Sequence, residues 1–271
     1  MMIRFLQENF DMNKNVIFCY SGTGNCLDLA KNIAKGIGGA DIVMMRAKPA
    51  VCDVSEAERV GFVFPCYGGG APEDVLTYAS YIRVNPNAYT FGISQSAAYA
   101  GTGLSRLNHI IPLKYWRTVT HQCSCIWLFP HDLMFPKMNA EDAQKRSEQL
   151  AAEIAGEILA GRVTEKDPPR NMLNVLENRA WPAIAEKKIA QFAVSSKCIG
   201  CGQCVKLCPR KNIWLENGRA VIGKSCSQCL GCLQYCPVSA ISIGKITDQR
   251  EHYHNPNISV EDLMQEVIYI A

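Results

Sequence analysis

Eight of the fourteen cysteines in this chain of 271 residues lie in two short runs. The runs read CIGCGQCVKLCP, from Cys198 to Pro209, and CSQCLGCLQYCP, from Cys226 to Pro237. Both have the spacing Cys-x2-Cys-x2-Cys-x3-Cys-Pro, which is a bacterial iron–sulfur pattern. Thiolates are soft ligands that suit zinc and iron–sulfur clusters. The two runs therefore predict that the chain holds metal through cysteine sulfur.

The position of each cysteine within its run predicts which cluster it holds. In proteins with two clusters, the fourth cysteine of such a run, before the proline, ligates the cluster of the other run. One [4Fe-4S] cluster is then expected on Cys198, Cys201, Cys204 and Cys236, and the second on Cys226, Cys229, Cys232 and Cys208. Gly200, Gly202 and Gly231 would let backbone N–H groups turn toward the sulfurs and help to set the potential.

Structural zinc is the alternative interpretation of these cysteines. Zinc sites usually have two Cys-x2-Cys pairs set well apart, whereas here three cysteines fall close together and a proline follows the fourth. We therefore favour iron–sulfur clusters. Residues 191–245 resemble the bacterial two-cluster ferredoxins, with all eight ligands present.

The region before the cysteine runs alternates between β-branched or aromatic stretches and amphipathic stretches. Strands are expected at 16–20, 41–45, 59–64, 90–93 and 121–129, and helices at 27–36, 72–83, 101–111 and 139–161. Strands that alternate with helices predict an α/β fold with a parallel sheet covered on both faces.

Proline and composition divide the chain into four parts. A proline pair at 168–169 ends the long helix. We expect an α/β domain at 14–162, a helical linker at 163–190 broken near Pro182, a small α+β cluster domain at 191–245 and a tail at 246–271. In the tail, Ser259 to Asp262 could cap a short helix.

Three glycine-rich loops follow strands of the α/β region. YSGTGN, at 20–25, precedes a helix, where N–H groups and the helix dipole attract phosphate. It is not a dinucleotide fingerprint, because Leu27 occupies the third glycine position, and no P-loop lysine follows. FPCYGGGAP at 64–72 and FGISQSAAYAGTG at 91–103 follow two more strands. Such loops meet at the carboxyl ends of parallel strands, where these folds bind ligands.

With these loops, YSGTGN resembles the FMN phosphate loop of flavodoxins, and residues 14–162 resemble a flavodoxin-like domain. Nearly the whole chain is similar to the fused flavodoxin–ferredoxin proteins of anaerobic bacteria and archaea, the EFR-type ferredoxins. That likeness includes CPRKNI after the first run and YHNPNIS at 253–259. It implies a flavodoxin-like, doubly wound parallel sheet of five strands followed by a small two-cluster ferredoxin domain.

The resemblance also implies FMN and the residues that would hold it. The phosphate would lie on Ser21, Gly22, Thr23, Gly24, Asn25 and Cys26. The isoalloxazine ring would lie between two loops, formed by Pro65, Cys66, Tyr67, Gly68, Gly69 and Gly70 and by the segment that includes Gln95, Ser96 and Gly101. Flavodoxins usually have Thr or Ser at the place of Cys26. A thiol is a weaker donor, so we expect a lower affinity for FMN and a spectator thiol at this residue.

Two further cysteines, Cys123 and Cys125, are candidate ligands. Cys123 and Cys125 alternate on the strand expected at 121–129, so both would face one way. With no third partner nearby in the sequence, we expect them to be buried structural thiols.

Charge and cofactors together predict an electron carrier. Residues 191–245 carry seven Lys or Arg and one acid, a net +6, so that the rest of the chain is −3 within a total of +3. Two oxidised clusters with their eight thiolates add about −4. We expect electrons to pass between FMN, the two clusters and a redox partner protein, docked by opposite charge on an acidic partner or on the chain itself.

Two other function classes stay open: an FMN-dependent reductase of a quinone, nitroarene or enone fed by its own clusters, and a redox sensor. No catalytic residues are predicted. Neither a nucleic acid nor a membrane is expected as a partner, since the apolar runs are too short to span a bilayer. The N-terminus does not have the pattern of a signal peptide, so we expect a cytoplasmic protein.

Overall fold

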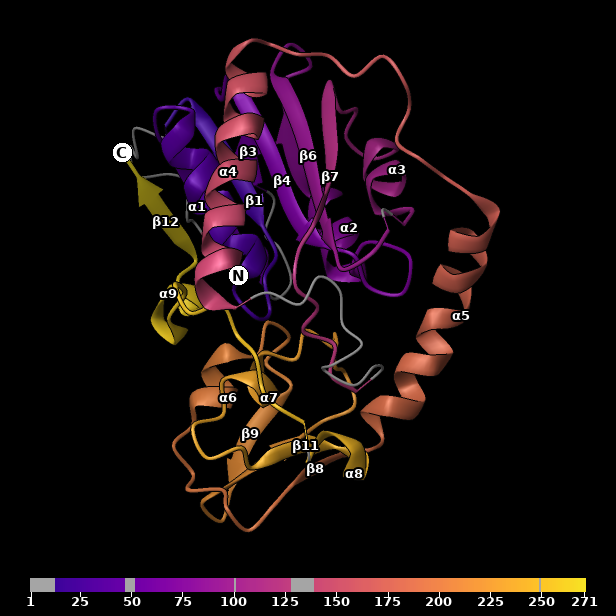
Figure 1. Ribbon diagram of the computed structural model, residues 1–271, viewed down its shortest axis with the longest axis vertical. Coiled ribbons are helices and arrows are strands. Elements are labelled where there is room, and N and C mark those ends of the chain that lie inside the picture. The colour runs from indigo at the N-terminus through magenta and orange to yellow at the C-terminus, as the bar shows by residue number, and fades with distance from the viewer. Residues whose placement is uncertain (1–12, 47–51, 100, 128–138, 249) are drawn as a thin grey trace.

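The computed structural model describes residues 13–46, 52–99, 101–127, 139–248 and 250–271. An α/β domain forms the upper part of Figure 1, and the segment with the two cysteine runs lies below it. Helix α5 (Met172–Ile189) connects the two along one side, and the C-terminal residues return along the other.

A six-stranded sheet forms the centre of the α/β domain. Its order is β12-β2-β1-β4-β6-β7, and the first of these strands is antiparallel to its neighbour while the others are parallel. The parallel strands are β1 (Asn15–Cys19), β2 (Ala40–Met44), β4 (Arg59–Pro65), β6 (Tyr89–Ser96) and β7 (Tyr115–Thr120). Without β12 (Val267–Ile270), the order is the 2-1-3-4-5 arrangement of flavodoxin-like sheets.

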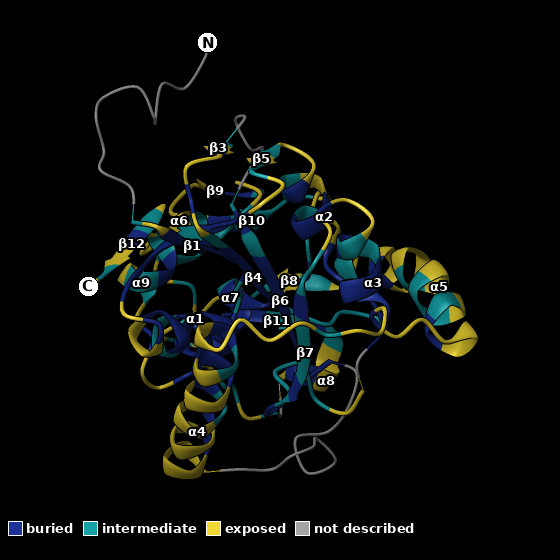
Figure 2. Ribbon diagram, turned by 90° about the horizontal axis from the view of Figure 1, so that it is seen from above, coloured by how far each residue is buried: buried dark blue, intermediate teal, exposed yellow. Residues whose placement is uncertain are grey.

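Helices cover both faces of this sheet, as the alternation of side chains along β1 requires. Ile17 and Cys19 face α1 (Asn25–Gly36) and α4 (Ala140–Leu159), whereas Val16 and Phe18 face α2 (Glu73–Ala79) and α3 (Gly103–Asn108). Seen from above, the sheet is buried between its helices, and α5 projects to one side with much of its surface exposed (Figure 2). The mixed α/β fold predicted from the sequence is therefore correct.

The segment with the cysteine runs is built from short elements. β8 (Phe192–Val194) pairs with β11 (Ile241–Ile243), and β9 (Ile213–Glu216) forms a hairpin with β10 (Arg219–Ile222). Three helical turns complete it: α6 (Gln203–Leu207), α7 (Gly231–Gln234) and α8 (Gly244–Thr247). A separate parallel pair joins β3 (Cys52–Val54) to β5 (Ile82–Val84) in the α/β domain. No helix among the described residues is long and apolar enough to cross a membrane.

Three expectations about the elements were wrong. The sheet has six strands rather than five, because β12 from the tail pairs with β2. The strand expected at 121–129 lies earlier, at β7, while 121–127 form a loop and 128–129 lie outside the described residues. Helix α5 runs through Pro182 without a break. Proline removes one backbone hydrogen bond, and contacts between α5 and the α/β domain, described below, support the helix in the turns before Pro182.

The short helix expected in the tail is confirmed. Ser259 caps α9 (Val260–Met264) by accepting a hydrogen bond from the amide of Asp262, whose carboxylate accepts one from the amide of Ser259. Lys31 of α1 also pairs with Asp262 at 2.6 Å. The tail is therefore fastened to the α/β domain on both sides of the turn before β12.

Candidate functional site

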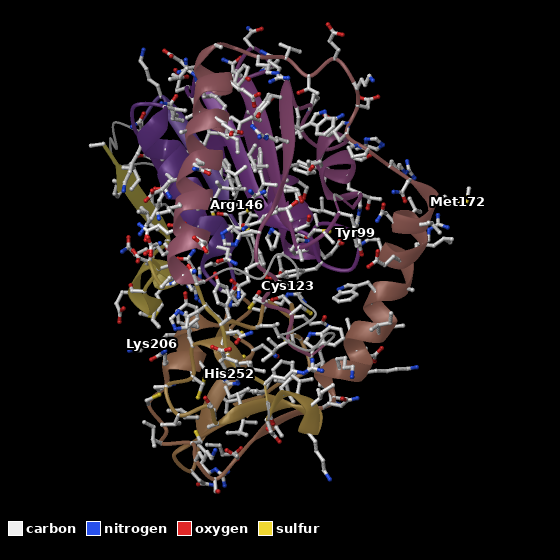
Figure 3. All side chains as sticks on the ribbon, in the orientation of Figure 1. Tyr99, Cys123, Arg146, Met172, Lys206 and His252 are labelled. Carbon is white, nitrogen blue, oxygen red and sulfur yellow. The ribbon has the colours of Figure 1, made fainter. Side chains whose placement is uncertain are left out.

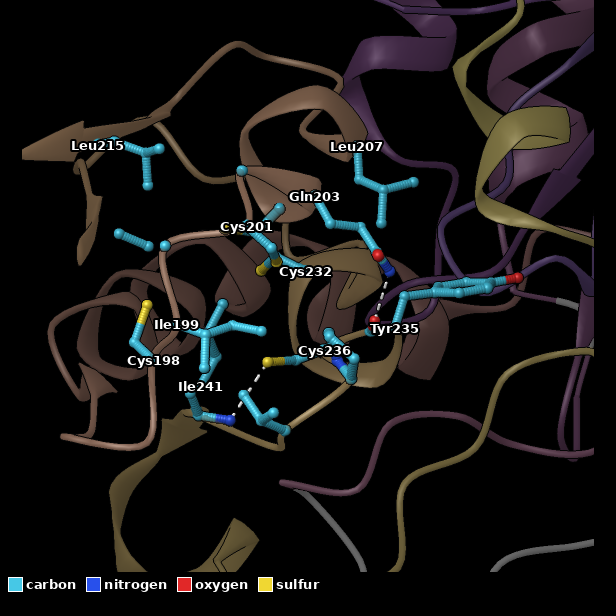
Figure 4. A pocket seen from close by; sticks show the side chains of 17 residues that line it. Cys198, Ile199, Cys201, Gln203, Leu207, Leu215, Cys232, Tyr235, Cys236 and Ile241 are labelled. Atoms are coloured by element: carbon cyan, nitrogen blue, oxygen red, sulfur yellow. Dashed lines mark hydrogen bonds between the residues drawn. The ribbon is translucent and has the colours of Figure 1, made fainter. Parts of the chain in front are cut away.

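Five cysteines from both runs line one cavity in the cysteine-rich segment (Figure 4). Four of them are Cys198, Cys201, Cys204 and Cys236, the set predicted for the first cluster, and Cys232 also reaches this cavity. The space not filled by atoms is about 400 Å³, part of it open to solvent, and its walls are mostly apolar. The fourth cysteine of the second run thus lies beside the first three of the first run, as the crossed assignment requires.

The other four cysteines form a second group below the α/β domain. Burial raises the pKa of Cys226, Cys229 and Cys232, and the nearby thiol of Cys208 raises each of them further. The pKa of Cys229 is about 12. Since such coupling requires proximity, the structure brings together the set predicted for the second cluster.

The two runs adopt the same local backbone. Left-handed residues recur 28 positions apart: Gly200 and Gln228, Gly202 and Leu230, Lys211 and Ser239. The cysteines before each proline receive equivalent hydrogen bonds, from the amide of Asn212 to Cys208 Sγ and from that of Ala240 to Cys236 Sγ, both at 3.2 Å. The segment is therefore a structural repeat that presents two equivalent sets of thiols.

Backbone amides also point at other sulfurs. The N–H groups of Ala220 and Gly200 lower the pKa of Cys198, and the amide of Gln228 donates to Cys226 Sγ at 3.3 Å. N–H···S hydrogen bonds of this kind stabilise thiolates and tune cluster potentials. Among the described residues, no three Cys, His, Asp or Glu side chains are grouped as the ligands of a single metal ion would be. The donor set fits clusters, with sulfurs arranged around a cavity and amides aimed at them.

The loop between β1 and α1 has donors suited to an anion. Gly24 is left-handed, with φ of 95°, and Thr23 Oγ1 donates to Ser124 Oγ at 3.0 Å. Asn25 and Cys26 are buried in the first turn of α1, where helix geometry leaves amides without intrahelical partners. Neither amide has an acceptor among the described residues. Buried unpaired amides of this kind fit a phosphate.

The cysteine-rich segment lies directly on this loop. A Cβ atom at Gly22 would stand 2.0 Å from the carbonyl oxygen of Cys229, and Tyr20 Oη donates to Ser227 Oγ at 2.9 Å. A Cβ at Gly24 would stand within 3.0 Å of Asn255, Ile258 and Tyr235. The second cysteine group and the tail therefore close over the outer side of the loop predicted to hold phosphate.

Residues of the tail bond to the same loop. The amide of Asn255 donates to the Thr23 carbonyl at 2.8 Å, and Tyr253 Oη donates to Asn25 Oδ1 at 2.9 Å. The likeness at 253–259 pointed to these residues by sequence, but their role in covering the loop is visible only in the structure. The loop after β7 was also missed: it contributes Ser124, which accepts from Gln234 at 2.7 Å.

The two loops predicted to enclose a flavin ring contact each other. The Cys66 amide donates to the Gln95 carbonyl and the Thr102 amide to the Gly69 carbonyl, both at 2.7 Å. A Cβ at Gly101 would stand 2.6 Å from the Gly69 carbonyl oxygen. These contacts hold the two loops against each other at that point. The residues predicted to enclose the ring therefore lie together, next to the loop that has a donor set suited to phosphate.

Helix α5 covers the outer side of the same glycines. The indole of Trp181 lies where a Cβ of Gly68 would point, and Asn178 Nδ2 donates to the Gly68 carbonyl at 3.3 Å. Tyr99 Oη bonds to the Glu177 carboxylate at 2.5 Å (Figure 3 shows Tyr99 facing α5). The segment interpreted as a linker is thus a cover for the loop that includes Gly68, Gly69 and Gly70.

The remaining predicted residues have structural contacts. Cys26 Sγ donates to Gln95 Oε1 at 3.1 Å, and burial raises the pKa of this thiol well above its usual value. Ser96 accepts the His121 amide at 2.9 Å through its carbonyl, and Tyr67 packs edge-on against Tyr20. The thiol at residue 26 is therefore kept in its neutral form by burial, and it also bonds to the side chain of Gln95.

The two other cysteines of interest lie in a loop between the domains. Cys123 is half-buried, and its sulfur accepts the amide of Cys125 at 3.4 Å (Figure 3). Both pack against a cluster of apolar residues that includes Trp127, Leu230 and Leu233. The expected alternation on a strand was wrong, because this segment is a loop.

Comparison with known proteins identifies the cysteine-rich segment. Residues 194–214 match the family described as a 4Fe-4S binding domain. An uncharacterized ferredoxin of Methanocaldococcus jannaschii is 39% identical over 66 residues, which are 22% of this chain and 84% of that protein. A ferredoxin of Pyrobaculum islandicum is 45% identical over 47 residues, which are 17% of this chain and 44% of that protein.

Two solved structures align with a larger part of the chain. The rubredoxin oxygen:oxidoreductase of Desulfovibrio gigas aligns over 55% of this chain and 37% of its own, at 13% identity and a TM-score of 0.34. The Flv1 flavodiiron core of Synechocystis aligns over 55% of this chain and 36% of its own, at 19% identity and a TM-score of 0.31. The chain thus spans little more than a third of either structure.

The family match at 194–214 includes the first cysteine run. Ferredoxin-2 of Desulfomicrobium norvegicum is 59% identical over 27 residues, which are 10% of this chain and 46% of that protein. The archaeal ferredoxin from M. jannaschii, in contrast, is covered over most of its length. The family match and this relative show that the chain, through its cysteine-rich segment, belongs to the ferredoxins.

Proposed function

We propose that the protein carries electrons, one at a time, between two [4Fe-4S] clusters and a redox partner protein. When bound, iron–sulfur clusters supply one-electron chemistry. The observation that carries the proposal is the repeat of the two cysteine runs, whose equivalent backbones present two sets of four thiols with amides directed at the sulfurs. The first set would be Cys198, Cys201, Cys204 and Cys236, and the second Cys226, Cys229, Cys232 and Cys208.

The residues around each set would adjust the potential of its cluster and give the two clusters different surroundings. Amides that donate to sulfur stabilise negative charge there, while buried apolar walls exclude water and lower the local dielectric. The second set lies against the α/β domain through the contact of Cys229 with Gly22, whereas Cys201 of the first set is exposed. The two clusters would therefore differ in solvent access and in potential.

We further propose that the loop at 21–26 binds the phosphate of FMN. The buried unpaired amides of Asn25 and Cys26 support this, together with the flavodoxin-like strand order. FMN would add a centre that exchanges one or two electrons beside clusters that exchange one. Because the loops at 65–70 and 95–101 touch and α5 covers them, we propose that α5 moves away when the flavin ring enters.

Anaerobic purification with counting of iron, sulfide and flavin tests both proposals separately. We expect about eight iron atoms per chain, as two cubane clusters contain, and flavin recovered as FMN. Tightly bound zinc in place of iron would refute the cluster proposal. Iron without any flavin, after loading with excess FMN, would refute the flavin proposal alone.

A substitution at Thr23 tests the flavin site. Thr23→Val removes the hydroxyl that bonds to Ser124, and it should lower FMN content while iron stays unchanged. Gly24→Val would be a poor choice, because its side chain would collide with Asn255 and Ile258 whether or not FMN binds. Flavin retained at full content in Thr23→Val would argue against phosphate binding here.

A further inference from the structure

The two cysteine groups differ in what faces them. The second group is held against the α/β domain by the contact of Cys229 with Gly22 and by an ion pair of 2.8 Å between Arg210 and Asp74. Arg46 adds hydrogen bonds to the carbonyls of Lys206 and Leu263. The cavity of the first group is partly open to solvent, and Cys201 on it is exposed, although Leu207 and Tyr235 of its wall pack against the core of the α/β domain. Within the part of the chain that the structure describes, the first group is therefore the more accessible of the two to another protein.

The rim of the open cavity is apolar. Ile199 and Leu215 both line the cavity and are 65% and 44% exposed (Figure 4). Pro237, which also lines it, is exposed. Isolated exposed apolar residues are ordinary on a protein surface, but these surround the cavity of the proposed first cluster. Apolar contact at the centre of a docked interface would exclude water from the path of the electron.

Positive charge surrounds this rim. Lys197 directly precedes Cys198 and is exposed, and the exposed Arg219 lies between Gly218, whose carbonyl oxygen is in contact with Gly200, and Ala220, which lines the cavity. Glu216 is the only acid in residues 191–245, against seven basic residues. Of those seven, only Arg210 makes an ion pair within the described part of the chain. The basic charge left over faces solvent.

We propose that the rim formed by Lys197, Ile199, Leu215 and Arg219 is the docking surface for an acidic one-electron redox protein. This inference rests on the proposed electron-transfer function and names the partner's chemistry. The partner would carry carboxylates around its redox centre, complementary to Lys197 and Arg219, with an apolar centre against Ile199 and Leu215. One electron would leave the first cluster and reduce the partner's centre, with no bond formed and no proton moved.

The acidic remainder of the chain is not the occupant of this rim. The α/β domain contacts the segment at Cys229, Ser227, Arg210, Lys206 and Tyr235, and none of these contacts among the described residues involves Lys197, Ile199, Leu215 or Arg219. The two sides of the segment are thus assigned to different tasks, one internal and one external. The exposed, positively charged rim is therefore available to bind a separate protein.

Binding to defined probe proteins tests the proposal on the full chain with its clusters, under anaerobic conditions. The acidic probe is the soluble domain of cytochrome b5, and the basic probe is cytochrome c. Titration calorimetry should show that the acidic probe binds more tightly than the basic one, with an affinity that falls as salt rises. Lys197→Glu and Arg219→Gln should each weaken binding of the acidic probe by roughly 5- to 10-fold, and Ile199→Ser by a few-fold.

Lys35→Glu is the matched control. Lys35 is an exposed residue of α1 in the α/β domain, and its substitution changes net charge as Lys197→Glu does. It should leave binding of the acidic probe nearly unchanged. Equal weakening by both variants, or tighter binding of cytochrome c than of cytochrome b5, would overturn the docking proposal.

The iron content and EPR signal of each variant show whether a failure concerns the docking surface or the proposed electron-transfer function. Iron absent from the wild-type protein would remove the proposed function itself. Full iron content with rim variants that bind the acidic probe as the wild type does would refute the docking surface alone. Should Lys197→Glu lose iron, Arg219→Gln and Ile199→Ser still decide the question.

Discussion

Gly22 lies in direct contact with the backbone of Cys229, so that a side-chain carbon at residue 22 would stand 2.0 Å from the Cys229 carbonyl oxygen and 2.7 Å from its Cβ. Atoms do not approach so closely without overlap, so only glycine permits the contact. It joins the loop after β1 to a proposed ligand of the second cluster. Gly22, which is predicted to line the phosphate site, thus also allows the cysteine-rich segment to pack against this loop.

Replacing Gly22 by alanine should therefore push the cysteine-rich segment away from the α/β domain. The added methyl group meets backbone atoms, which cannot rotate aside, and overpacking of this kind costs about 1–3 kcal/mol. We expect a lower midpoint of thermal unfolding and faster proteolysis at the contact between the domains, both measured under anaerobic conditions.

Gly156→Ala is the control for this substitution. Gly156 lies in α4, and nothing lies within 4 Å of the place where its Cβ would be. Alanine there should be neutral or stabilising by up to about 1 kcal/mol, because it favours helix. If Gly22→Ala has the same midpoint of thermal unfolding and the same rate of proteolysis as Gly156→Ala, the contact with Cys229 does not hold the domains together.

The grouping of the cysteines could be predicted from the sequence because ligand spacing is local. Each run lies within a dozen residues, and the two runs repeat at an offset of 28, from Cys198 to Cys226. The strand–helix alternation was legible for the same reason, since periodicity is carried by neighbouring residues. The structure places both patterns close to where they were expected.

The covering of the α/β domain could not be predicted, because it depends on contacts between distant residues. Trp181 meets Gly68, and Asn255 meets Thr23, across long stretches of chain. β12 pairs with β2 although 222 residues separate Met44 from Val267, and nothing in the sequence VIYI says which edge it joins. Pro182 predicted a break, but a single lost hydrogen bond is outweighed where a helix has tertiary support.

Cys236→Ala tests the crossed assignment of the ligands. Because Cys236 lines the cavity with Cys198, Cys201 and Cys204, its loss should remove or degrade the cluster of the first run. Iron should fall from about eight toward four per chain, the content of one remaining cubane cluster. The surviving EPR signal should be that of a chain in which the first run is disabled, as in Cys201→Ala.

Cys52→Ala is the matched control, since Cys52 lies in β3 of the α/β domain and belongs to neither cysteine group. It should keep full iron. An EPR spectrum of Cys236→Ala that matches Cys229→Ala instead would mean that each run holds its own cluster, and the crossed assignment would be wrong.

Trp181→Ala tests whether α5 restricts the flavin site. The indole lies on Gly68 and packs with Trp127 at 5.6 Å between ring centroids. Removing it should destabilise the arrangement in which α5 covers the loop. A larger fraction of the protein would then be able to bind FMN, and the apparent affinity for FMN should rise. Fluorescence titration of the cluster-loaded chain with FMN measures this.

The neighbouring substitution Ile184→Ala serves as comparison, because Ile184 is a half-exposed residue of the same helix. It should alter the affinity for FMN less than Trp181→Ala does. A fall in affinity on removing Trp181 would show that the indole supports bound flavin rather than obstructing it.

His121→Gln should reduce the loss of stability at mildly acidic pH. His121 is 3% exposed beneath α4, its Nε2 lies 3.4 Å from the Ala143 carbonyl, and Nδ1 has no partner among the described residues. Burial lowers its pKa below the ordinary 6.5, while Asp28 opposes the shift and Arg146 adds to it. The folded protein therefore keeps this ring neutral at a pH where the unfolded chain takes up a proton.

The sign of the effect follows from that difference in proton uptake. Above pH 6.5 neither state binds the proton and His121 adds no slope, whereas below it the unfolded state is favoured by about 1.4 kcal/mol per pH unit until the folded pKa is reached. Glutamine can still donate to the Ala143 carbonyl but does not titrate. Urea unfolding at pH 7.5 and 5.5 should show a smaller loss of stability on acidification in His121→Gln than in the wild type, by the same linkage. The exposed His109, changed to Gln, is the control and should leave the difference as it is. Equal losses in the wild type and in His121→Gln would show that burial does not lower the pKa of this ring in the folded protein.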